Sequence, residues 1–217
     1  MKKLTAIALA LICVLTLAAC GNTTEKDKAF VCGTVTDNVF ESEFSGFRMT
    51  VSDGWVFSGE EEIMEMMDFT ADSLSEILSD REAKNLELSK QKTIYDAMAV
   101  DQNTGSNVIV MYENMSASIG GSKYTPDSYA DALEDQLTEA GAEAGMDYSL
   151  KSKETIDFCG YEYLSVTWEA ESQGITLDQS YLLRKVGDYM LIICISCVPQ
   201  TGVTLDSIMD MFESLEA

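Results

Sequence analysis

Apolar and polar residues alternate through the second half of the chain, and glycines separate the alternating stretches. In residues 160–172, Leu164, Val166 and Trp168 fall on one face, while more polar side chains fall on the other. A period of two is typical of β-strands. It predicts strands at 147–157, 160–172, 175–186 and 189–198. The last of these contains YMLIICISC, and its nearly continuous apolar character predicts a strand that is covered on both faces.

Shorter strand-like stretches occur earlier in the chain. Residues 94–102 and 106–113 flank a Thr-Gly pair, which predicts a β-hairpin. The second arm of this hairpin contains VIVMY, which is apolar on both faces. Residues 46–55, GFRMTVSDGW, predict one more strand, followed by a turn that delivers Trp55 to the core.

Helical spacing replaces the alternation in three places. Ser58 followed by Glu61 forms a capping box, and it predicts a helix with Ile63, Met67, Leu74 and Leu78 on its apolar side. Thr125 followed by Pro126 is a favoured helix start. The apolar side of this second helix consists of Tyr129, Leu133, Leu137, Ala140 and Ala144. The chain is predicted to close on a short amphipathic helix through Leu205, Ile208, Phe212 and Leu215. Residues 81–92 are polar with mixed charge and predict no element.

The predicted elements define a fold class. Hairpin connections between successive strands favour an antiparallel sheet. Two strands that are apolar on both faces require cover on both sides of that sheet. Because three or four helices are available for this, the sequence predicts an α+β fold in which an antiparallel sheet is sandwiched between helices, an αβα sandwich.

A short motif gives this architecture a family resemblance. Residues 38–55, NVFESEFSGFRMTVSDGW, carry a Gly-Phe pair at 46–47 and a Gly-Trp pair at 54–55. Together with the order of the elements, this motif resembles the PsbP-like superfamily over residues 38–216. Members commonly carry a proline two residues before the second glycine, where this chain has Ser52. The resemblance implies an αβα sandwich and an accessory role, docking onto a larger assembly. It transfers no functional residue, because metal roles ascribed to histidines in the family have no counterpart here.

The N-terminal residues have the layout of a bacterial lipoprotein signal. Lys2 and Lys3 precede an apolar stretch of sixteen residues, shorter than the ~20 that a bilayer-spanning helix needs. The LAAC that ends at Cys20 resembles a lipobox, which implies cleavage before Cys20, a diacylglyceryl thioether on its sulfur and N-acylation in many bacteria. The alternative is a plain secretory signal followed by a chance cysteine. The predicted layout is 1–19 signal peptide, 20–37 lipidated cysteine and short tether, and 38–217 a single domain.

The charge of the chain restricts its partners. The formal net charge is −23, and the form without Lys2 and Lys3 would carry −25. Such a chain is expected to repel nucleic acid and anionic lipid headgroups. The sequence therefore predicts a domain that acyl chains hold at the membrane and charge pushes away from the lipid surface.

An acidic row follows the predicted helix after Pro126. Its members recur every four residues and include no lysine or arginine: Asp127, Asp131, Asp135, Glu139 and Glu143. Each like-charged pair at this spacing costs about 0.2–0.5 kcal/mol, so four pairs cost roughly 1–2 kcal/mol at low salt. A basic protein partner or bridging cations would explain the row, and the alternative is one more solvated face on a very acidic domain.

The absence of histidine excludes several chemistries. Ser-His-Asp and Cys-His catalysis and imidazole metal sites all require this residue. The remaining local motifs each have a structural explanation. Ser89 to Lys92 is interpreted as a basic loop, Asp101 to Gly105 as a hairpin turn rather than a calcium loop, and the methionines near 64–67 and 209–211 as core packing rather than Cu(I) ligands. Cys194 and Cys197 lie about 10 Å apart along a strand and point to opposite faces, so no disulfide between them is expected.

These observations favour a lipid-anchored binding or accessory module that docks onto a protein partner on the outer face of the bacterial cytoplasmic membrane, or on the periplasmic side of a Gram-negative membrane. No catalytic residue, metal or cofactor is predicted. The alternatives are a small solute- or metal-binding lipoprotein and, less favoured, a carboxylate-based enzyme. An enzyme would require a closed cleft with Glu162 or Glu169 buried beside a second acid. The partner, the oligomeric state and the oxidation state of the four later cysteines stay open.

Overall fold

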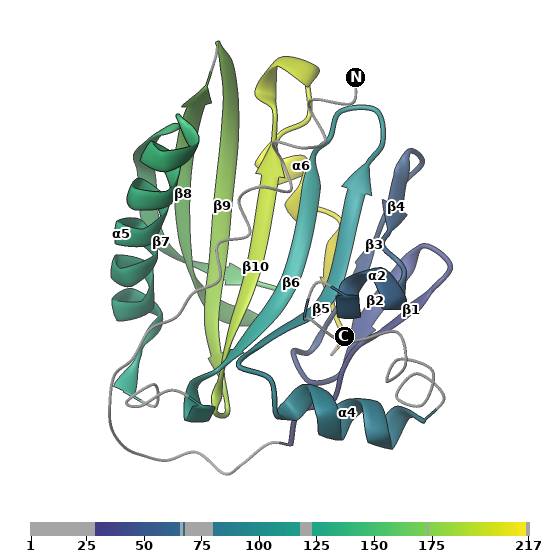
Figure 1. Cartoon of the computed structure of the whole chain (residues 1–217). Coiled ribbons are helices and arrows are strands. Elements are labelled where there is room, and N and C mark those ends of the chain that lie inside the picture. Colours follow the sequence, from purple (N-terminus) through teal and green to yellow (C-terminus); the bar gives the residue numbers. More distant parts are fainter. Residues whose placement is uncertain (1–28, 66, 68–79, 118–122, 173, 216–217) are drawn as a thin grey trace.

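Two antiparallel sheets form the framework of the computed structural model, which describes residues 29–65, 67, 80–117, 123–172 and 174–215 (Figure 1). The larger sheet has the strand order β4-β5-β6-β10-β9-β8-β7. Its strands are β4 (Trp55–Phe57), β5 (Thr93–Asp101), β6 (Asn107–Asn114), β7 (Asp147–Phe158), β8 (Tyr161–Ser172), β9 (Ile175–Val186) and β10 (Tyr189–Cys197). The predicted hairpin and the four predicted later strands are therefore confirmed.

The smaller sheet has the order β1-β2-β3-β11. Its strands are β1 (Thr34–Thr36), β2 (Val39–Ser42), β3 (Phe47–Thr50) and β11 (Phe212–Ser214). The last strand corrects the predicted closing helix, because helical structure ends at Met209 and Phe212 pairs with Met49 of β3. Phe212 gains more contact as a strand residue, since its ring lies 5.3 Å from that of Phe47 and 5.3 Å from that of Phe158.

Helices of very different length accompany the sheets. They are α2 (Glu60–Glu65), α4 (Arg81–Ser89), α5 (Pro126–Ala144) and α6 (Leu205–Met209), with 3-10 turns η1 (Met115–Ala117) and η3 (Pro199–Thr201). Thr125 and Ser128 cap the start of α5 reciprocally, and Gly145 ends it with a φ of 71°. These ends confirm the predicted helix. The helix α4 was not predicted, and it buries only Leu88 among its nine residues.

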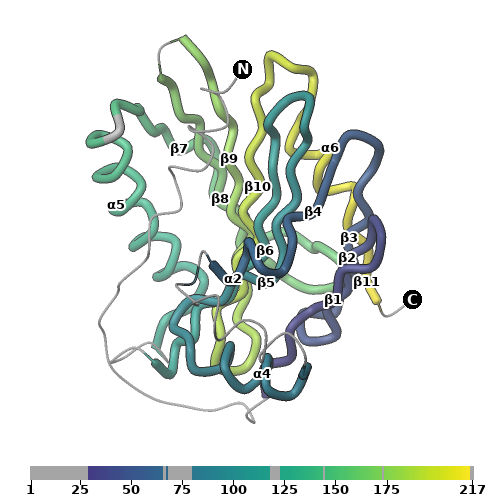
Figure 2. Tube along the Cα trace, turned by 45° about the vertical axis from the view of Figure 1, so that its right-hand side comes forward, coloured from purple at the N-terminus to yellow at the C-terminus, as the bar shows by residue number. Residues whose placement is uncertain are grey.

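The larger sheet lies between two layers (Figures 1 and 2). On one face, α5 packs through Tyr129, Leu133 and Leu137. The opposite face is covered by the smaller sheet and α6, and Ile208 of α6 belongs to the core on this side. The α+β class and its layered arrangement are confirmed, with the addition that one covering layer is itself a small sheet rather than helices alone.

Strand β10 separates the two cores, as its apolar sequence predicted. Cys194 belongs to the core beneath α5, whereas Cys197 belongs to the core beneath the smaller sheet. Both are free thiols, as are Cys32 and Cys159. The prediction that Cys194 and Cys197 point to opposite faces is therefore confirmed.

The folded part begins earlier than the predicted boundary at residue 38. Phe30 is 4% exposed, and its ring lies 5.2 Å from that of Tyr112 and 5.3 Å from that of Phe44. Phe30 and the residues after it therefore belong to the folded part and not to the tether predicted over 20–37, because aromatic burial fixes this segment to the core. Residues 1–28, including the signal and Cys20, lie outside the described residues, as do the predicted helical positions Leu74 and Leu78. Among the helices described, none combines the length and apolar character needed to cross a bilayer.

Candidate functional site

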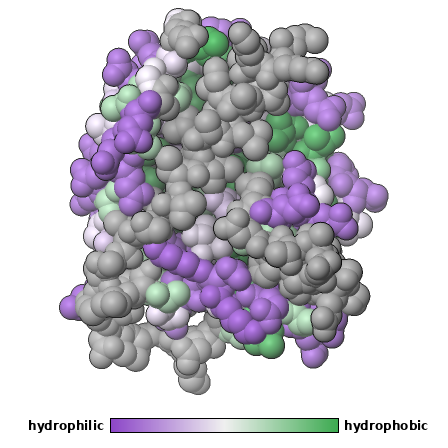
Figure 3. Space-filling model, viewed as in Figure 1, coloured by the Kyte–Doolittle hydropathy of each residue, from purple (hydrophilic) through white to green (hydrophobic). Residues whose placement is uncertain are grey.

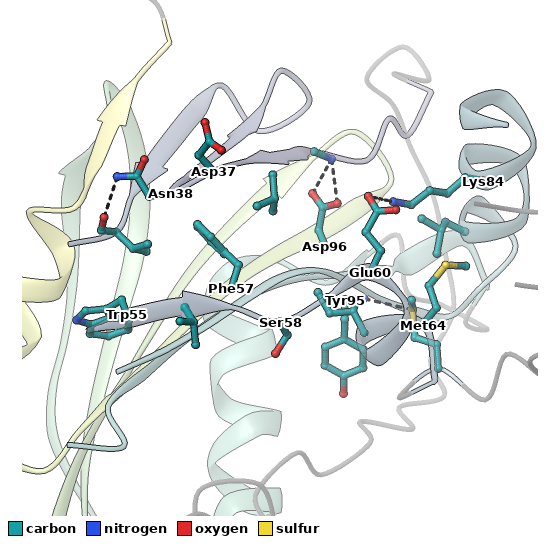
Figure 4. Close-up of a pocket in the computed structure, with 18 residues that line it drawn as sticks. Asp37, Asn38, Trp55, Phe57, Ser58, Glu60, Met64, Lys84, Tyr95 and Asp96 are labelled. Carbon is teal, nitrogen blue, oxygen red and sulfur yellow. Dashed lines mark hydrogen bonds and ion pairs between the residues drawn. The ribbon is translucent and has the colours of Figure 1, made fainter. Parts of the chain in front are cut away.

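A groove of about 530 Å³ lies where the smaller sheet meets the β4–β5 edge of the larger one. We call it the inter-sheet groove. Its walls come from the β1–β2 turn, β4, the start of β5, and the helices α2 and α4. Side chains from all of these elements face the same space in Figure 4. The groove thus draws on residues that are up to 63 positions apart, from Gly33 to Asp96.

Asp96 enters the groove because β5 is irregular. Tyr95 pairs with Met111 and Ala97 pairs with Val110, so Asp96 is the extra residue of a β-bulge with no partner on β6. A bulge re-aims one side chain, and the alternation of faces resumes one residue later along the strand. The Asp96 carboxylate accepts the backbone N–H of Gly33, at 2.9 Å to Oδ1 and 3.1 Å to Oδ2.

Gly33 is required for this contact. A Cβ at this position would lie 2.2 Å from Cε2 of Phe40 and 2.8 Å from the carbonyl oxygen of Glu41. Phe40 is fully buried, so it has no space into which to move. Two further bonds hold the same segment, because Asn85 accepts the N–H of Cys32 and Arg81 donates to its carbonyl oxygen. The helix α4 and the bulge therefore fix the inner wall of the groove.

The electrostatics at this end are unusual for a carboxylate. Burial raises the pKa of Asp96 to about 7, and the charge of Glu60 adds to the shift. The Gly33 N–H and the cations Lys84 and Arg81 act in the opposite direction without cancelling it. Lys84 Nζ lies 2.9 Å from Glu60 Oε1, so this lysine is already paired with the outer carboxylate. Asp96 is thus poised to gain or lose a proton near neutral pH.

Aromatic and apolar side chains line the rest of the groove. Trp55 and Asn38 lie at the end opposite Asp96, and Phe57 projects between the two ends (Figure 4). Trp55 is half-buried and packs against the core while it also faces the groove. Trp55 therefore packs against the core, as predicted, and in addition lines the groove. Asn38 donates to the carbonyl oxygen of Val51 at 3.1 Å, which fixes the turn on this side.

The predicted acidic row lies elsewhere, on the outward face of α5. All five members are exposed, and this side of the molecule is largely hydrophilic in Figure 3. If the row serves a basic partner, its five acids are expected to lack lysine or arginine partners within the protein, and for two of them this is wrong. Lys153 of β7 lies 2.7 Å from Asp131 and 3.7 Å from Asp127. No lysine or arginine is shown to pair with Asp135, Glu139 or Glu143 in the part of the chain that the structure describes.

The two strand acids singled out for an enzyme do not meet in a cleft. Glu162 is exposed, and Glu169 forms an ion pair with Lys151 across from Asp178 of β9. Neither lines the inter-sheet groove. Glu60 and Asp96 share one end of the groove (Figure 4), but Glu60 is 55% exposed and paired with Lys84, so these two acids do not form the closed cleft that an enzyme would require.

A second buried carboxylate serves the fold. Glu113 is 1% exposed, accepts the hydroxyl of Tyr129 at 2.7 Å and lies 3.7 Å from Lys92 Nζ. Burial raises the pKa of Glu113, while Tyr129 and Lys92 oppose the shift. This cluster joins the first turn of α5 to β6 and is sealed beneath the helix.

Two other sequence motifs have the structural roles expected of them, whereas Ser89, interpreted as part of a basic loop, ends the helix α4. Asp101 caps the β5–β6 turn by accepting from the Asn103 N–H and the Thr104 hydroxyl, and Gly105 adopts a φ of 78°. Met64 is buried in the core. Across the described ranges, no three Cys, Asp or Glu side chains gather as a metal site.

Sequence reasoning missed the groove for identifiable reasons. Two of its charged residues lie on helices. Lys84 falls in a stretch for which no element was predicted, and Glu60 was interpreted as part of a helix start. One signal was available, because Asp96 is a lone acid between apolar residues in TIYDAMAV. An unexplained charge within an apolar strand indicates either a bulge or a site.

The comparisons with known proteins assign no family to the chain. No family model matches it, and no curated protein matches it. Among solved structures it is similar to the solution structure of cyanobacterial PsbP (CyanoP) from Synechocystis sp. PCC 6803. The match has 11% sequence identity and a TM-score of 0.47, and it covers 89% of this chain and 98% of that one. The neighbour bears the name of the family that residues 38–216 resemble, but a likeness at this level assigns neither a partner nor an activity.

Proposed function

We propose that the protein is an extracytoplasmic accessory module that docks onto a basic surface of a protein partner. The observation that supports this proposal is the acidic row on α5, which stands exposed along the outward face of the longest helix. Lys153 neutralises the N-terminal end of the row, at Asp127 and Asp131. The docking surface is therefore assigned to its C-terminal half, at Asp135, Glu139 and Glu143.

The energetics favour a partner for this half. Like charges four residues apart destabilise a helix by about 0.2–0.5 kcal/mol per pair. Glu143 also lies near the C-terminus of α5, where the helix dipole disfavours negative charge. A basic partner would relieve both effects on binding and would associate faster through electrostatic steering.

The test compares two variants with equal changes in charge. One carries Asp135→Asn, Glu139→Gln and Glu143→Gln, and the control carries Glu61→Gln, Glu62→Gln and Glu65→Gln on α2, where these acids are also exposed. Each serves as bait for membranes of the organism that expresses the protein, at low and at high salt. The first variant should lose a salt-sensitive partner that the control retains. Equal capture by both variants would leave the row as a solvated face.

We also propose that lipid on Cys20 holds the module at the outer face of a membrane. The order of positive start, apolar stretch and LAAC supports this proposal. Nine residues, from Gly21 to Ala29, would then separate the lipid from Phe30, a reach of at most about 30 Å. The partner is accordingly expected in or directly beside the same membrane.

A further inference from the structure

We propose that the inter-sheet groove binds a small organic cation, a protonated amine that carries an apolar body, with its ammonium at Asp96 and its body along Phe57 toward Trp55. This site is separate from the acidic row on α5, so it goes beyond the docking function. The argument has three parts: an unused acceptor, the sign of the local charge, and the shape of the apolar wall.

The acceptor capacity of Asp96 exceeds what the described residues supply. An ionised carboxylate offers about four lone-pair positions. Among the described residues, the hydrogen bonds to its oxygens come from a single N–H, that of Gly33. Asp96 is half-buried and faces the groove, where a ligand ammonium would bring three donors. A ligand ammonium would therefore complete the hydrogen bonding of Asp96.

The charge around the groove favours a cation over an anion. Its lining includes three acids, Asp37, Glu60 and Asp96, against one lysine, Lys84. Lys84 is committed to Glu60, and its side chain is only 14% exposed, whereas that of Glu60 is 55% exposed. Arg81 does not line the groove, and it donates to the carbonyl oxygen of Cys32. An anionic ligand would meet this acidic lining without a free cation among the described lining residues to pair with it, and the strongly negative chain would repel it at a distance.

The shape of the groove specifies an apolar body. The apolar lining includes Phe57, Val35 and Val51, and Phe57 lies between Asp96 and Trp55 (Figure 4). A volume of about 530 Å³ falls within the range of roughly 300–1,000 Å³ that is usual for small-molecule sites. Such sites combine mainly apolar walls with a few polar groups that fix orientation. Asp96, Glu60 and Lys84 lie at one end, and Phe57 lies between them and Trp55 (Figure 4), so a ligand with its charge at Asp96 would lay an apolar body along Phe57, while Asp37 and Asn38 border the far end.

The experiment uses three probes that differ only in their head group: 4-phenylbutylamine, 4-phenylbutanol and 4-phenylbutanoate. Binding to the full-length protein in lipid nanodiscs is measured by calorimetry, with empty nanodiscs as the blank. Fluorescence locates the ligand, because Trp55 lines the groove whereas Trp168, the other tryptophan, is 2% exposed in the core beneath α5. The amine should bind most tightly and change the emission of Trp55. Equal affinities for the amine and the alcohol, or tightest binding of the carboxylate, would overturn the proposal.

Two substitutions at the groove should act in opposite directions. Asp96→Asn keeps an acceptor for Gly33 but removes the charge, and it should weaken amine binding about tenfold or more. Lys84→Gln removes the competing cation and should tighten amine binding several-fold. Asp135→Asn, an equal charge change on α5, should leave the affinity unchanged. If Asp96→Asn binds the amine as the unsubstituted protein does, or if Lys84→Gln weakens binding, the ammonium does not lie at Asp96. Because the two variants move in opposite directions, loss of fold in one of them cannot imitate the pattern.

Binding should also depend on pH through Asp96. The titratable and charged groups that face it are Glu60 of α2, Lys84 and Arg81 of α4, Cys32 beside β1 and Tyr112 of β6. Since the ammonium needs the ionised carboxylate, amine affinity should fall between pH 8 and pH 5 in the unsubstituted protein. The Asp96→Asn variant should lose most of this dependence. An identical pH profile in both proteins would assign the titration to another group and overturn the placement of the ammonium.

Discussion

Asp96 shows how a single residue converts a structural strand into part of a site. Its neighbours Tyr95 and Ala97 are buried in the cores on opposite sides of the larger sheet. The bulge between them turns the carboxylate toward Gly33 and the groove. Burying a carboxylate with one donor costs free energy, which appears as a pKa raised to about 7. Costs of this kind tend to collect at functional sites, because folding alone would favour an apolar residue at this position.

The first prediction concerns the pH dependence of stability. The carboxyl of Asp96 has a pKa of about 7 in the folded protein and about 3.9 in the unfolded chain. Between these values the folded state binds more protons than the unfolded state, so Asp96 lowers stability as the pH rises from about 4 through 7. Three units of pKa correspond to about 4 kcal/mol. Asp96→Asn should therefore match the unsubstituted protein near pH 4 and exceed it in stability by a few kcal/mol at pH 8.

Guanidinium titrations at pH 4, 6 and 8 measure this difference. Glu113 and Asp178 also have raised pKa values from burial, so the informative quantity is the difference between Asp96→Asn and the unsubstituted protein. Asp135→Asn, at an exposed position of α5, serves as the control and should change stability by no more than a few tenths of a kcal/mol at each pH. Parallel stability curves for Asp96→Asn would mean that Asp96 titrates alike in the folded and unfolded states.

At the scale of elements, α4 is the helix on which the groove depends most. It supplies Lys84, and its residues Arg81 and Asn85 hold the chain at Cys32. The helix has little core of its own, since it buries only Leu88. It depends instead on its N-cap, Asp80, whose carboxylate accepts the N–H groups of Glu82 and Ala83.

The second prediction follows from this cap. Asp80→Ala should destabilise the protein by about 1 kcal/mol, because two backbone donors lose their partner. Asp80→Ser keeps a capping oxygen and should retain most of the stability. Urea denaturation of the two variants beside the unsubstituted protein measures the effect. A loss of equal size in both variants would show that Asp80 acts through its charge rather than as a cap.

The third prediction concerns α5 and β7 together. Lys153 joins Asp127 and Asp131, but these acids are more than 70% exposed, so each pair contributes little. Lys153→Gln should cost about 0.5 kcal/mol and restore the repulsion along the row, whereas Asp135→Asn with Glu139→Gln should stabilise the protein by a few tenths of a kcal/mol. Both effects should shrink in high salt, which thermal unfolding at two salt concentrations can establish. Effects that are independent of salt would rule out an electrostatic cause.

Long, regular elements could be predicted from the sequence, and short or irregular ones could not. The alternation that predicts β8 and the Thr125-Pro126 start that predicts α5 are local signals, and the structure matches them closely. The strand β11 has three residues and exists because β3 is available to pair with it. An isolated sequence around Phe212 carries no trace of that distant partner, and its apolar spacing fits a helix equally well.

The groove could not be predicted either, because it too depends on contacts between segments that are distant in the sequence. Its lining comes from five segments, and no single one has the pattern of a site. The bulge at Asp96 is a matter of pairing with β6, which only the folded sheet reveals. By contrast, the acidic row could be read directly, since a helix fixes the positions of residues four apart. Its pairing with Lys153 could not, because that contact crosses from α5 to β7.

For the whole molecule, the two proposed sites lie on different parts of the fold. The acidic row faces outward from α5 on one side of the larger sheet, and the groove opens beside the smaller sheet and α2 (Figures 1 and 4). A partner on α5 and a ligand in the groove would therefore not compete for the same surface. The twisted larger sheet is the element that they share, and both α5 and Asp96 of β5 are anchored to it.

The last prediction concerns the whole chain at the membrane. With a net charge of −23, the folded domain should gain nothing from contact with anionic lipid, so any stable association must come from another source. If Cys20 carries acyl chains, replacing it with serine should release the protein from membranes, because each buried methylene of a chain contributes about 0.8 kcal/mol and none would remain. The variant should also stay uncleaved, since the signal would lack the cysteine that the lipobox requires. Phase partitioning in detergent, together with the intact mass, measures both consequences in a single preparation. Cys32→Ser is the matched control, because that thiol is buried in the fold and should have no bearing on partitioning. Equal partitioning of Cys20→Ser and the unsubstituted protein would mean that the domain reaches the membrane through its partner, and the acidic row would then have to supply the attachment as well as the docking.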